Sequence, residues 1–341
     1  MQYHPPFTDT ILKSRATRVA QVIQRESSVL VTGGNGFIGR HLVQRLLELD
    51  CRITIVNRNP LESKAPAGLK VYSNGLSNAL KSSLIKPGDF EYVFHLAGNS
   101  SVGRSVSDPV GDFRSCIEET IFLLEALRMA AKPPLLVFPS SAAVYGEPKS
   151  LPIKESDPTI PLSPYGVSKL ATENYIAVYC RLYGLRSVCF RPFSLYGPYQ
   201  KQLVIFDFIN KLNANPKRLE VLGDGNQQRD FLYIDDFISL MLYACDPLSP
   251  PGYSETYNAA SGISYSIREL LAVVCDVMEL SPQIIYSNIN RPGDPLKWAV
   301  DVTKIRRLGF SSATPLSAGL RQVLNWFYTE NISELSTKER Y

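Results

Sequence analysis

Short apolar runs alternate with longer amphipathic segments along the first half of this chain. The apolar runs are rich in β-branched residues, which predicts strands, and the segments between them carry apolar residues at helical spacing. The predicted strands are Ser28–Thr32, Arg52–Val56, Lys70–Tyr72, Tyr92–Leu96, Leu135–Phe138 and Ser187–Phe190, and the predicted helices are Phe37–Leu49, Val110–Ala131 and Pro164–Tyr183. Such alternation is typical of a parallel sheet with helices on both faces. We therefore predict an α/β fold built on a Rossmann-type doubly wound parallel sheet.

The pattern changes beyond Arg191, where prolines and glycines divide the chain into short pieces. Helical spacing returns near residues 266–279 and 315–328. We predict an N-terminal extension over 1–27, a dinucleotide-binding domain over 28–191 and parts of 225–265, a smaller C-terminal α/β substrate lobe over most of 192–330, and a frayed tail over 331–341. In the extension, apolar spacing between residues 10 and 25 favours a surface helix over a targeting segment.

Composition and charge narrow the classes of protein that this chain can be. With 45% hydrophobic and 20% charged residues among 341, it has ample apolar surface for a core, which excludes a disordered or fibrous chain. The 36 basic and 32 acidic residues are interspersed, so we expect no nucleic-acid partner. No run approaches the roughly 20 apolar residues of a membrane span. Six dispersed cysteines predict reduced thiols in a cytoplasmic protein, and three scattered histidines predict no metal site.

A glycine-rich turn joins the first predicted strand to the first predicted helix. The segment Gly33-Gly34-Asn35-Gly36-Phe37-Ile38-Gly39 fits both the GxGxxG and the GxxGxxG spacing. Glycines permit a tight turn and let a pyrophosphate approach the backbone at the positive end of the helix. Because the motif lies between a strand and a helix, we favour a dinucleotide site over a simple turn. The predicted cofactor contacts here are Gly33, Gly36, Phe37, Ile38 and Gly39.

The end of the second predicted strand bears on the choice of cofactor. NAD-binding folds place a carboxylate there to bind the adenosine ribose, but this chain has Asn57 followed by Arg58. A guanidinium can pair with the 2′-phosphate that a carboxylate would repel. We therefore predict a bound nicotinamide dinucleotide, NADP in preference to NAD. The alternative is that Arg58 stacks on the adenine or faces the solvent.

Two Tyr-x-x-x-Lys pairs occur in the chain, and their contexts differ. A glycine and a proline interrupt the pair Tyr145 and Lys149, so these side chains need not share a helix face. Tyr165 and Lys169 open a predicted helix and lie one turn apart on one face. An ammonium beside a phenol favours the phenolate, so Tyr165 can exchange a proton with an alcohol or a ketone while hydride moves. Only the second pair is arranged for chemistry.

A serine pair, Ser140-Ser141, follows the strand that ends at Phe138. The carboxyl ends of parallel strands line the cofactor crevice, so a serine at this position can hold a substrate oxygen. The alternative, which an isolated serine pair would favour, is a turn or a helix cap.

These motifs and several that follow make the chain resemble the extended short-chain dehydrogenase/reductase family. The further motifs are His95-Leu96-Ala97-Gly98, Ser140-Ser141-Ala142-Ala143-Val144-Tyr145-Gly146, Arg191-Pro192-Phe193-Ser194-Leu195-Tyr196-Gly197-Pro198, Gly223-Asp224-Gly225, Arg229-Asp230-Phe231 and Arg291-Pro292-Gly293-Asp294. They occur in the family's order over roughly residues 28 to 328. The resemblance implies a Rossmann domain, a smaller substrate domain and action on nucleotide sugars. The stretch His95 to Pro109 is most similar to the UDP-galactose 4-epimerase-like members.

The resemblance also implies a role for each motif residue. Ser141 is the catalytic serine, Tyr165 the acid/base, and Lys169 the residue that tunes Tyr165 and holds the nicotinamide ribose. The implied cofactor contacts include Asn57, Arg58, Leu96, Ala97, Gly98, Tyr165 and Lys169, and the implied substrate contacts are Ser141, Ser194, Arg229 and Arg291. Two arginines suit a substrate diphosphate, because guanidinium forks match phosphate oxygens. Ala142 and Ala143 stand where the family's dehydratases carry an Asp-Glu pair, so we do not expect dehydration.

Several positions depart from the family pattern. Ser194 replaces the usual Asn of the Arg-x-Phe-Asn motif, and Cys116 replaces an Asn that precedes the Gly-Thr pair, here Glu119-Thr120. Gly75 replaces an Asp that meets the adenine amine, and Asn57 replaces the ribose carboxylate. Three of these positions concern the cofactor or the active site.

Three functions fit these residues, and we favour the first. It is a nucleotide-sugar 4-epimerase that acts through transient oxidation at C4 by a bound nicotinamide cofactor. The second is an NADPH-dependent nucleotide-4-keto-sugar reductase, which Arg58 favours. The third is a catalytically silent NADP-binding sensor or scaffold. The expected partners are a nucleotide-diphosphate sugar and, by resemblance, a second copy of the chain that binds through the helices near 110–131 and 165–183.

Overall fold

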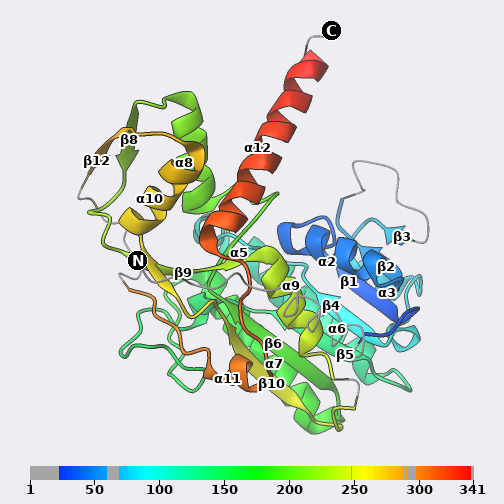
Figure 1. The fold of residues 1–341 in the computed structure, drawn as a ribbon. Helices are drawn as coiled ribbons and strands as arrows, with labels where there is room; N and C mark the ends of the chain where they lie inside the picture. The colour runs from blue at the N-terminus through cyan, green and yellow to red at the C-terminus, as the bar shows by residue number, and fades with distance from the viewer. Residues whose placement is uncertain (1–22, 60–68, 247, 288, 290–296, 339–341) are drawn as a thin grey trace.

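The computed structural model describes residues 23–59, 69–246, 248–287, 289 and 297–338 of the chain. Most of the helix predicted between residues 10 and 25 lies outside these residues, as does the segment Arg291 to Asp294. Figure 1 shows a large α/β domain, a smaller lobe beside it, and a last helix that extends away from both.

A seven-stranded parallel sheet forms the centre of the large domain. Its strands follow the order β10, β6, β5, β4, β1, β2, β3. They are β1 (Ser28–Thr32), β2 (Arg52–Val56), β3 (Leu69–Tyr72), β4 (Tyr92–His95), β5 (Leu135–Pro139), β6 (Arg186–Pro192) and β10 (Ser254–Ala259). The chain winds outward from β1 to β3 and then crosses to β4 on the other side of β1, which is where doubly wound folds open a ligand crevice. The predicted fold class is confirmed.

Helices cover both faces of this sheet because successive strand residues point to opposite sides. The helices of the domain are α2 (Phe37–Glu48), α3 (Leu76–Lys81), α4 (Val102–Ser107), α5 (Pro109–Phe113), α6 (Glu119–Arg128), α7 (Pro164–Tyr183) and α9 (Ile234–Tyr243). In β5, Leu136 and Phe138 belong to the core that α3, α6 and α7 cover. Leu135 and Val137 belong to the opposite core, which α2 and α9 cover. All four are buried, so the strand reads as a continuous apolar run.

The helix predicted over Val110–Ala131 is divided in the structure. It begins at Pro109, because the Asp108 side chain accepts a backbone N–H of the first turn and proline suits the first helical position. A π-helical turn, η2 (Arg114–Glu118), then separates α5 from α6. Such turns are frequent at functional sites, and Cys116 lies at the centre of this one.

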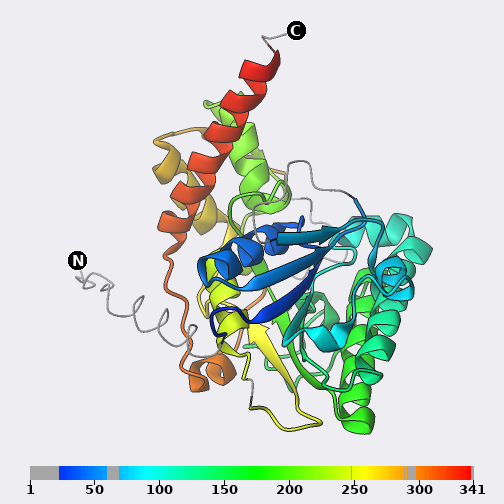
Figure 2. The ribbon, with the colours of Figure 1, turned by 90° about the vertical axis from the view of Figure 1, so that its right-hand side faces the viewer.

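The second lobe contains more regular structure than its proline- and glycine-rich sequence predicted. It has a three-stranded sheet in the order β11, β9, β7 and a parallel pair of β12 and β8. Its elements are β7 (Ser194–Tyr196), α8 (Leu203–Ala214), β8 (Arg218–Val221), β9 (Gln228–Tyr233), β11 (Ser264–Ser266), α10 (Ile267–Met278), β12 (Gln283–Tyr286), α11 (Thr303–Arg307) and α12 (Leu316–Lys338). Helix α12 continues past Asn331, where we predicted a frayed tail. Figure 2 shows the end of α12 projecting beyond the body.

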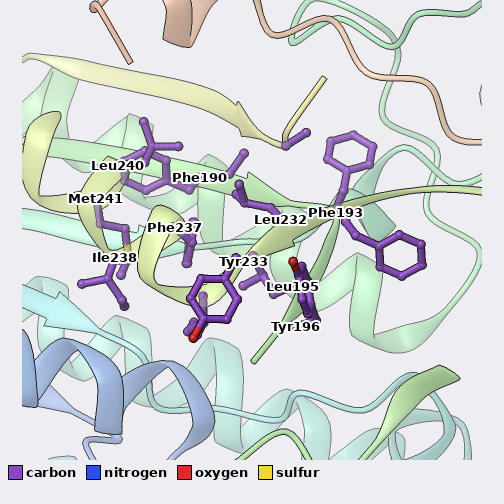
Figure 3. Close-up of a cluster of buried hydrophobic side chains, with 14 of the residues drawn as sticks. Phe190, Phe193, Leu195, Tyr196, Leu232, Tyr233, Phe237, Ile238, Leu240 and Met241 are labelled. Carbon is purple, nitrogen blue, oxygen red and sulfur yellow. The ribbon is translucent and has the colours of Figure 1, made fainter. Parts of the chain in front are cut away.

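A shared apolar core joins the lobe to the main sheet. Figure 3 shows Phe190 of β6, Phe237 of α9, Tyr196 of β7 and Leu232 of β9 within one cluster of buried side chains. The rings of Phe190 and Phe237 meet edge to face, with centroids 5.9 Å apart. Because β7 begins two residues after β6 ends, this core holds the second sheet at the carboxyl end of the main one.

Candidate active site

The glycine-rich turn after β1 leaves no space for a side chain at Gly33. Gly33 has a φ of +75°, and a Cβ at this position would lie 2.8 Å from the backbone nitrogen of Ala97. Gly36 is the residue before the first turn of α2 and has no side chain that could cap the helix. The N–H groups at the N-terminus of α2 therefore face the turn with no side-chain hydrogen bond from the cap residue. A turn of this shape at a helix N-terminus fits a pyrophosphate.

Tyr165 and Lys169 lie in the first turns of α7. The helix begins here because the Ser163 hydroxyl accepts the N–H of Gly166 at 3.2 Å. The Lys169 ammonium lies 5.8 Å from the centroid of the Tyr165 ring and donates a 2.9 Å hydrogen bond to the Pro139 carbonyl. Lys169 is buried and Tyr165 is half-buried. The arrangement places a phenol beside a fixed cation and keeps the phenol within reach of a ligand.

Ser141 follows β5, the strand to which Lys169 is bonded. Its hydroxyl caps the short 3-10 turn η3 (Ala142–Val144) by accepting the N–H of Ala143 at 3.1 Å. That bond uses one lone pair and leaves the hydroxyl proton to donate. The turn packs directly on α7, because a Cβ on Gly166 would lie 2.7 Å from the Ala143 carbonyl oxygen. Ser141 therefore caps a turn and also stands beside the helix that carries Tyr165.

The other tyrosine of the two pairs is part of a buried network. The Tyr145 hydroxyl donates to Asn258 Oδ1 at 2.6 Å and accepts from Arg191 Nη1 at 2.9 Å. Arg191 in turn forms an ion pair with Glu173 of α7 at 2.7 Å. Burial raises the pKa of Tyr145 to about 12. Lys149 is exposed, whereas the Tyr145 hydroxyl is bonded within the interior.

The residues after β2 border the place where a dinucleotide fold receives the adenosine. Asn57 is buried and donates from its amide to Asn35 Oδ1 of the glycine-rich turn at 2.9 Å. Arg58 is exposed, and a Cβ on Gly75 would meet only the Arg58 Cγ, at 3.9 Å. Asn57 thus holds the glycine-rich turn through Asn35, while Arg58 is exposed beside Gly75.

Two departures from the family pattern make specific contacts. The Cys116 sulfur accepts the N–H of Asn99 at 3.3 Å. The Glu119 carboxylate accepts the backbone N–H of Ser77 at 3.0 Å and its hydroxyl at 2.9 Å. The π turn and the start of α6 are therefore tied to the loop after β4 and to the start of α3.

Two of the predicted substrate residues, Ser194 and Arg229, fall on the second lobe. Ser194 opens β7, which pairs in parallel with β9, the strand that carries Arg229. The Arg229 guanidinium lies 5.5 Å from the ring centroid of Trp298, which also meets Phe193 edge to face. Arg291 lies outside the described residues. Sequence reasoning missed Trp298, because nothing local links it to an arginine 69 positions earlier.

Sequence reasoning also missed a buried carboxylate beside α7. Asp112 accepts the Ser168 hydroxyl at 2.6 Å and the Asn99 amide at 2.7 Å. It therefore links α5 to the helix of Tyr165 and to the loop after β4. The sequence offers only a weak signal for Asp112, which is a carboxylate in the short segment that follows Pro109.

Within the part of the chain that the structure describes, no three His, Cys, Asp or Glu side chains gather as a metal site would require. Among the same residues, no helix is both long and apolar enough to cross a bilayer.

The glycine turn at the switch point of a parallel sheet, with a Tyr-Lys pair at the same edge, defines a dinucleotide-dependent α/β enzyme. The chain belongs to the NAD dependent epimerase/dehydratase family, whose model matches residues 29–260. This confirms the resemblance to the extended short-chain dehydrogenase/reductases, and the chain is an NAD(P)-dependent enzyme of that family.

Similar proteins carry epimerase names. A putative UDP-glucose 4-epimerase of Methanocaldococcus jannaschii is 33% identical over 89% of this chain and 99% of its own. The solved UDP-N-acetylglucosamine 4-epimerase of Methanobrevibacter ruminantium, in complex with UDP-N-acetylmuramic acid, has a TM-score of 0.81 and 30% identity over 90% of this chain and 100% of its own. The UDP-glucose 4-epimerase of Thermus thermophilus, in complex with NAD, has a TM-score of 0.76 and 28% identity over 88% and 99% of the two chains.

Proposed function

We propose that this enzyme is a nucleotide-sugar 4-epimerase. The observation that carries the proposal is the position of Tyr165, held by α7 beside the buried Lys169 and the turn of Ser141, at the same sheet edge as the glycine turn. The epimerase names of similar proteins support it.

Each residue has a role in this reaction. A bound nicotinamide supplies the hydride acceptor and later the hydride donor. Tyr165, as the phenolate, takes the proton of the C4 hydroxyl while Ser141 donates a hydrogen bond to the same oxygen. The 4-keto sugar then rotates in the site, so that its other face is presented to the hydride. Tyr165 returns the proton to the C4 oxygen as the hydride adds to C4 on that face. Lys169 stabilises Tyr165 whenever it carries the phenolate charge, and no net oxidation occurs.

Dehydration does not fit these residues. Expelling water from C5 and C6 needs an acid and a base near the catalytic serine. The two residues that follow Ser141 are Ala142 and Ala143, which carry no exchangeable side-chain proton.

We assign the substrate diphosphate to the second lobe. Arg229 is half-buried at the strand that pairs with β7, where its guanidinium can donate to phosphate oxygens, and Ser194 offers a hydroxyl on the same small sheet. Arg291 is proposed as a second phosphate contact on sequence grounds alone.

We also propose that the cofactor is NADP rather than NAD. The support is Arg58, an exposed guanidinium at the end of β2, together with Asn57 in place of a carboxylate that would repel a 2′-phosphate. The NAD complexes of similar proteins make NAD the competing choice.

The same arginine favours a second candidate, an NADPH-dependent 4-keto-sugar reductase. The two functions differ in what happens to the cofactor, because an epimerase regenerates it in every catalytic cycle and a reductase oxidises it. A panel of UDP-sugars incubated without added cofactor separates them. Formation of the C4 epimer over many turnovers supports the epimerase, and product formation that stops at one equivalent of cofactor supports the reductase. No conversion of any UDP-sugar, and no reduction of a UDP-4-keto-sugar by added NADPH, supports the silent sensor.

Finally, we propose that two copies associate through α5, α6 and α7. These helices pack side by side and expose large apolar side chains, among them Val110, Phe113, Phe122 and Leu182. Large exposed apolar side chains on neighbouring helices are typical of an association face. Sedimentation of the wild type as a dimer and of Phe113→Glu as a monomer supports the proposal, whereas a monomeric wild type contradicts it.

A further inference from the structure

His95 lies inside a chain of hydrogen bonds at the end of β4. Its Nδ1 is 2.8 Å from Thr32 Oγ1, and its Nε2 is 3.0 Å from Thr120 Oγ1. All three side chains are buried. Thr32 immediately precedes the glycine turn, and Thr120 lies in the first turn of α6, so one imidazole connects two elements that border the crevice.

The directions of the bonds in this chain follow from the Cys116 carbonyl at one end and from the neutral charge of the buried imidazole. The Thr120 hydroxyl donates to the Cys116 carbonyl, which can only accept. His95 Nε2 must therefore carry a proton and donate it to Thr120. At the other end Thr32 Oγ1 accepts the N–H of Ala97 at 3.1 Å. Because a neutral ring protonated at Nε2 has no proton on Nδ1, the Thr32 hydroxyl donates to Nδ1. Donation then runs in one direction from the Ala97 amide to the Cys116 carbonyl, through a neutral imidazole protonated at Nε2.

The electrostatic surroundings agree with this geometry. Burial, with the charge of Lys169 as a smaller contribution, lowers the pKa of His95 to about 3. The imidazole is therefore neutral near pH 7. The His95 ring stacks on the ring of Phe138. The Lys169 ammonium lies 4.7 Å from the centroid of the same Phe138 ring.

The same π turn holds the loop after β4 at a second point. Asn99 donates its backbone N–H to the Cys116 sulfur, while Ala97 is tied through the histidine chain to the Cys116 carbonyl. Between them Gly98 has a φ of +140°, and a Cβ there would lie 3.2 Å from the Cys116 sulfur. Gly33 of the phosphate turn packs on the Ala97 nitrogen from the other side. The loop is thus fixed at both ends against the glycine turn.

We propose that His95 is a positioning residue for the cofactor site: as the Nε2-protonated neutral imidazole it locks the backbone of Leu96 to Gly98 against the phosphate turn. The role of this loop as a cofactor contact rests on the proposed function. The protonation state of His95 does not, so the two can fail separately.

The first experiment measures the protonation state of the His95 imidazole by ¹⁵N NMR. The chain has only three histidines, His4, His41 and His95, so labelling all of them with ¹⁵N gives three ring systems. His95→Asn identifies the one that belongs to His95. We expect one protonated and one unprotonated ring nitrogen, Nε2 and Nδ1 respectively, unchanged between about pH 5 and pH 8. A doubly protonated ring, or a proton on Nδ1, overturns the proposal.

The second experiment separates positioning from mere packing. Thr120→Val removes the hydroxyl at nearly constant shape, Thr120→Ser restores it, and Thr172→Val is a matched control because the buried Thr172 hydroxyl has no hydrogen-bond partner among the described residues. In fluorescence titrations with NADH and NADPH, we expect Thr120→Val to bind about three- to tenfold more weakly, since a neutral hydrogen bond contributes roughly that factor. Thr120→Ser and Thr172→Val should bind like the wild type.

Two results overturn the positioning role. One is a Thr120→Val protein with a lower melting temperature but unchanged dinucleotide affinity well below that temperature, which is the signature of packing alone. The other is a wild type that binds neither dinucleotide. Failure of the wild type to epimerise any UDP-sugar while it still binds NADH or NADPH contradicts the proposed function and leaves the role of His95 intact.

Discussion

The ammonium of Lys169 donates a 2.9 Å hydrogen bond to the carbonyl oxygen of Pro139, which ties the first turns of α7 to the end of β5. Tyr165 belongs to the helix and Ser141 to the turn after the strand. The bond therefore fixes the two proposed catalytic residues relative to each other. It also holds the lysine side chain in place, so its charge stays beside the Tyr165 ring.

Replacement of Tyr165 by Phe should abolish most of the activity. The ring and its packing remain, but the proton acceptor is lost, and general acid/base groups typically contribute a hundredfold or more to the rate. The measurement is kcat on the UDP-sugar that the panel identifies. Tyr175→Phe, an exposed tyrosine on the same helix, is the control and should keep the wild-type rate. Unchanged turnover of Tyr165→Phe would remove this tyrosine from the mechanism.

Gly33→Ala should prevent dinucleotide binding. The added methyl group would lie 2.8 Å from the Ala97 nitrogen, at a φ of +75° that alanine rarely adopts, so the turn must shift. Titration with NADH and NADPH measures the effect, and we expect an affinity loss of at least tenfold. In Gly103→Ala the new Cβ meets only the Ser101 hydroxyl, at 3.9 Å, so this control should bind normally. Equal affinities for the two variants would argue against the phosphate turn.

Arg58→Ala should change the preference between cofactors. If the guanidinium pairs with a 2′-phosphate, its loss weakens NADPH binding by about tenfold and leaves NADH binding nearly unchanged, because charged hydrogen bonds contribute roughly 1.5 to 3 kcal/mol. Lys70→Ala, another exposed cation in this region, is the control. Wild-type protein that binds NADH clearly more tightly than NADPH would refute the proposed preference.

Tyr145→Phe should lower stability rather than catalytic rate. It removes a hydroxyl that bonds both Asn258 and Arg191 in the interior, and leaving buried polar groups unsatisfied costs about 1 to 3 kcal/mol. Denaturant unfolding measures the loss. Glu173→Gln, which breaks the buried ion pair with Arg191, should cost more, about 3 kcal/mol. The idea fails if Tyr145→Phe unfolds like the wild type but turns over slowly.

Stability should decline in weak acid partly because of His95. Its pKa is about 3 in the folded protein against an ordinary value of 6.5. Above pH 6.5 neither state binds the proton, so the free energy of unfolding is unaffected. Between pH 6.5 and 3 the unfolded state binds a proton that the folded state excludes, so stability falls as the pH falls, by at most about 1.4 kcal/mol per pH unit.

His95→Asn removes this contribution. The free energy of unfolding of the variant should therefore depend less steeply on pH between about 6.5 and 4.5 than that of the wild type. The difference between the free energies of unfolding of the two proteins at each pH cancels the contribution of the carboxylates, because these titrate in both proteins. Parallel curves would show that His95 is not excluded from protonation in the folded state.

Local patterns carried much of the prediction. β1 and β2 begin and end where the apolar runs indicated, and α7 begins at Pro164 because Ser163 and proline form a strong helix start. The boundary of β6 and the π turn inside the predicted helix at 110–131 were not predictable, because both depend on contacts with other elements. The regular elements of the second lobe were obscured by its prolines and glycines.

The sequence by itself determined the glycine turn, the alternation of strands and helices, and the one-turn spacing of Tyr165 and Lys169, because each depends on neighbouring residues. Only the tertiary structure decided that Tyr145 is bound to Arg191 in the core and that Arg229 meets Trp298. It also decided that His95 joins Thr32 to Thr120. These contacts link residues 25 to 69 positions apart, and such pairs leave no periodic signal along the chain.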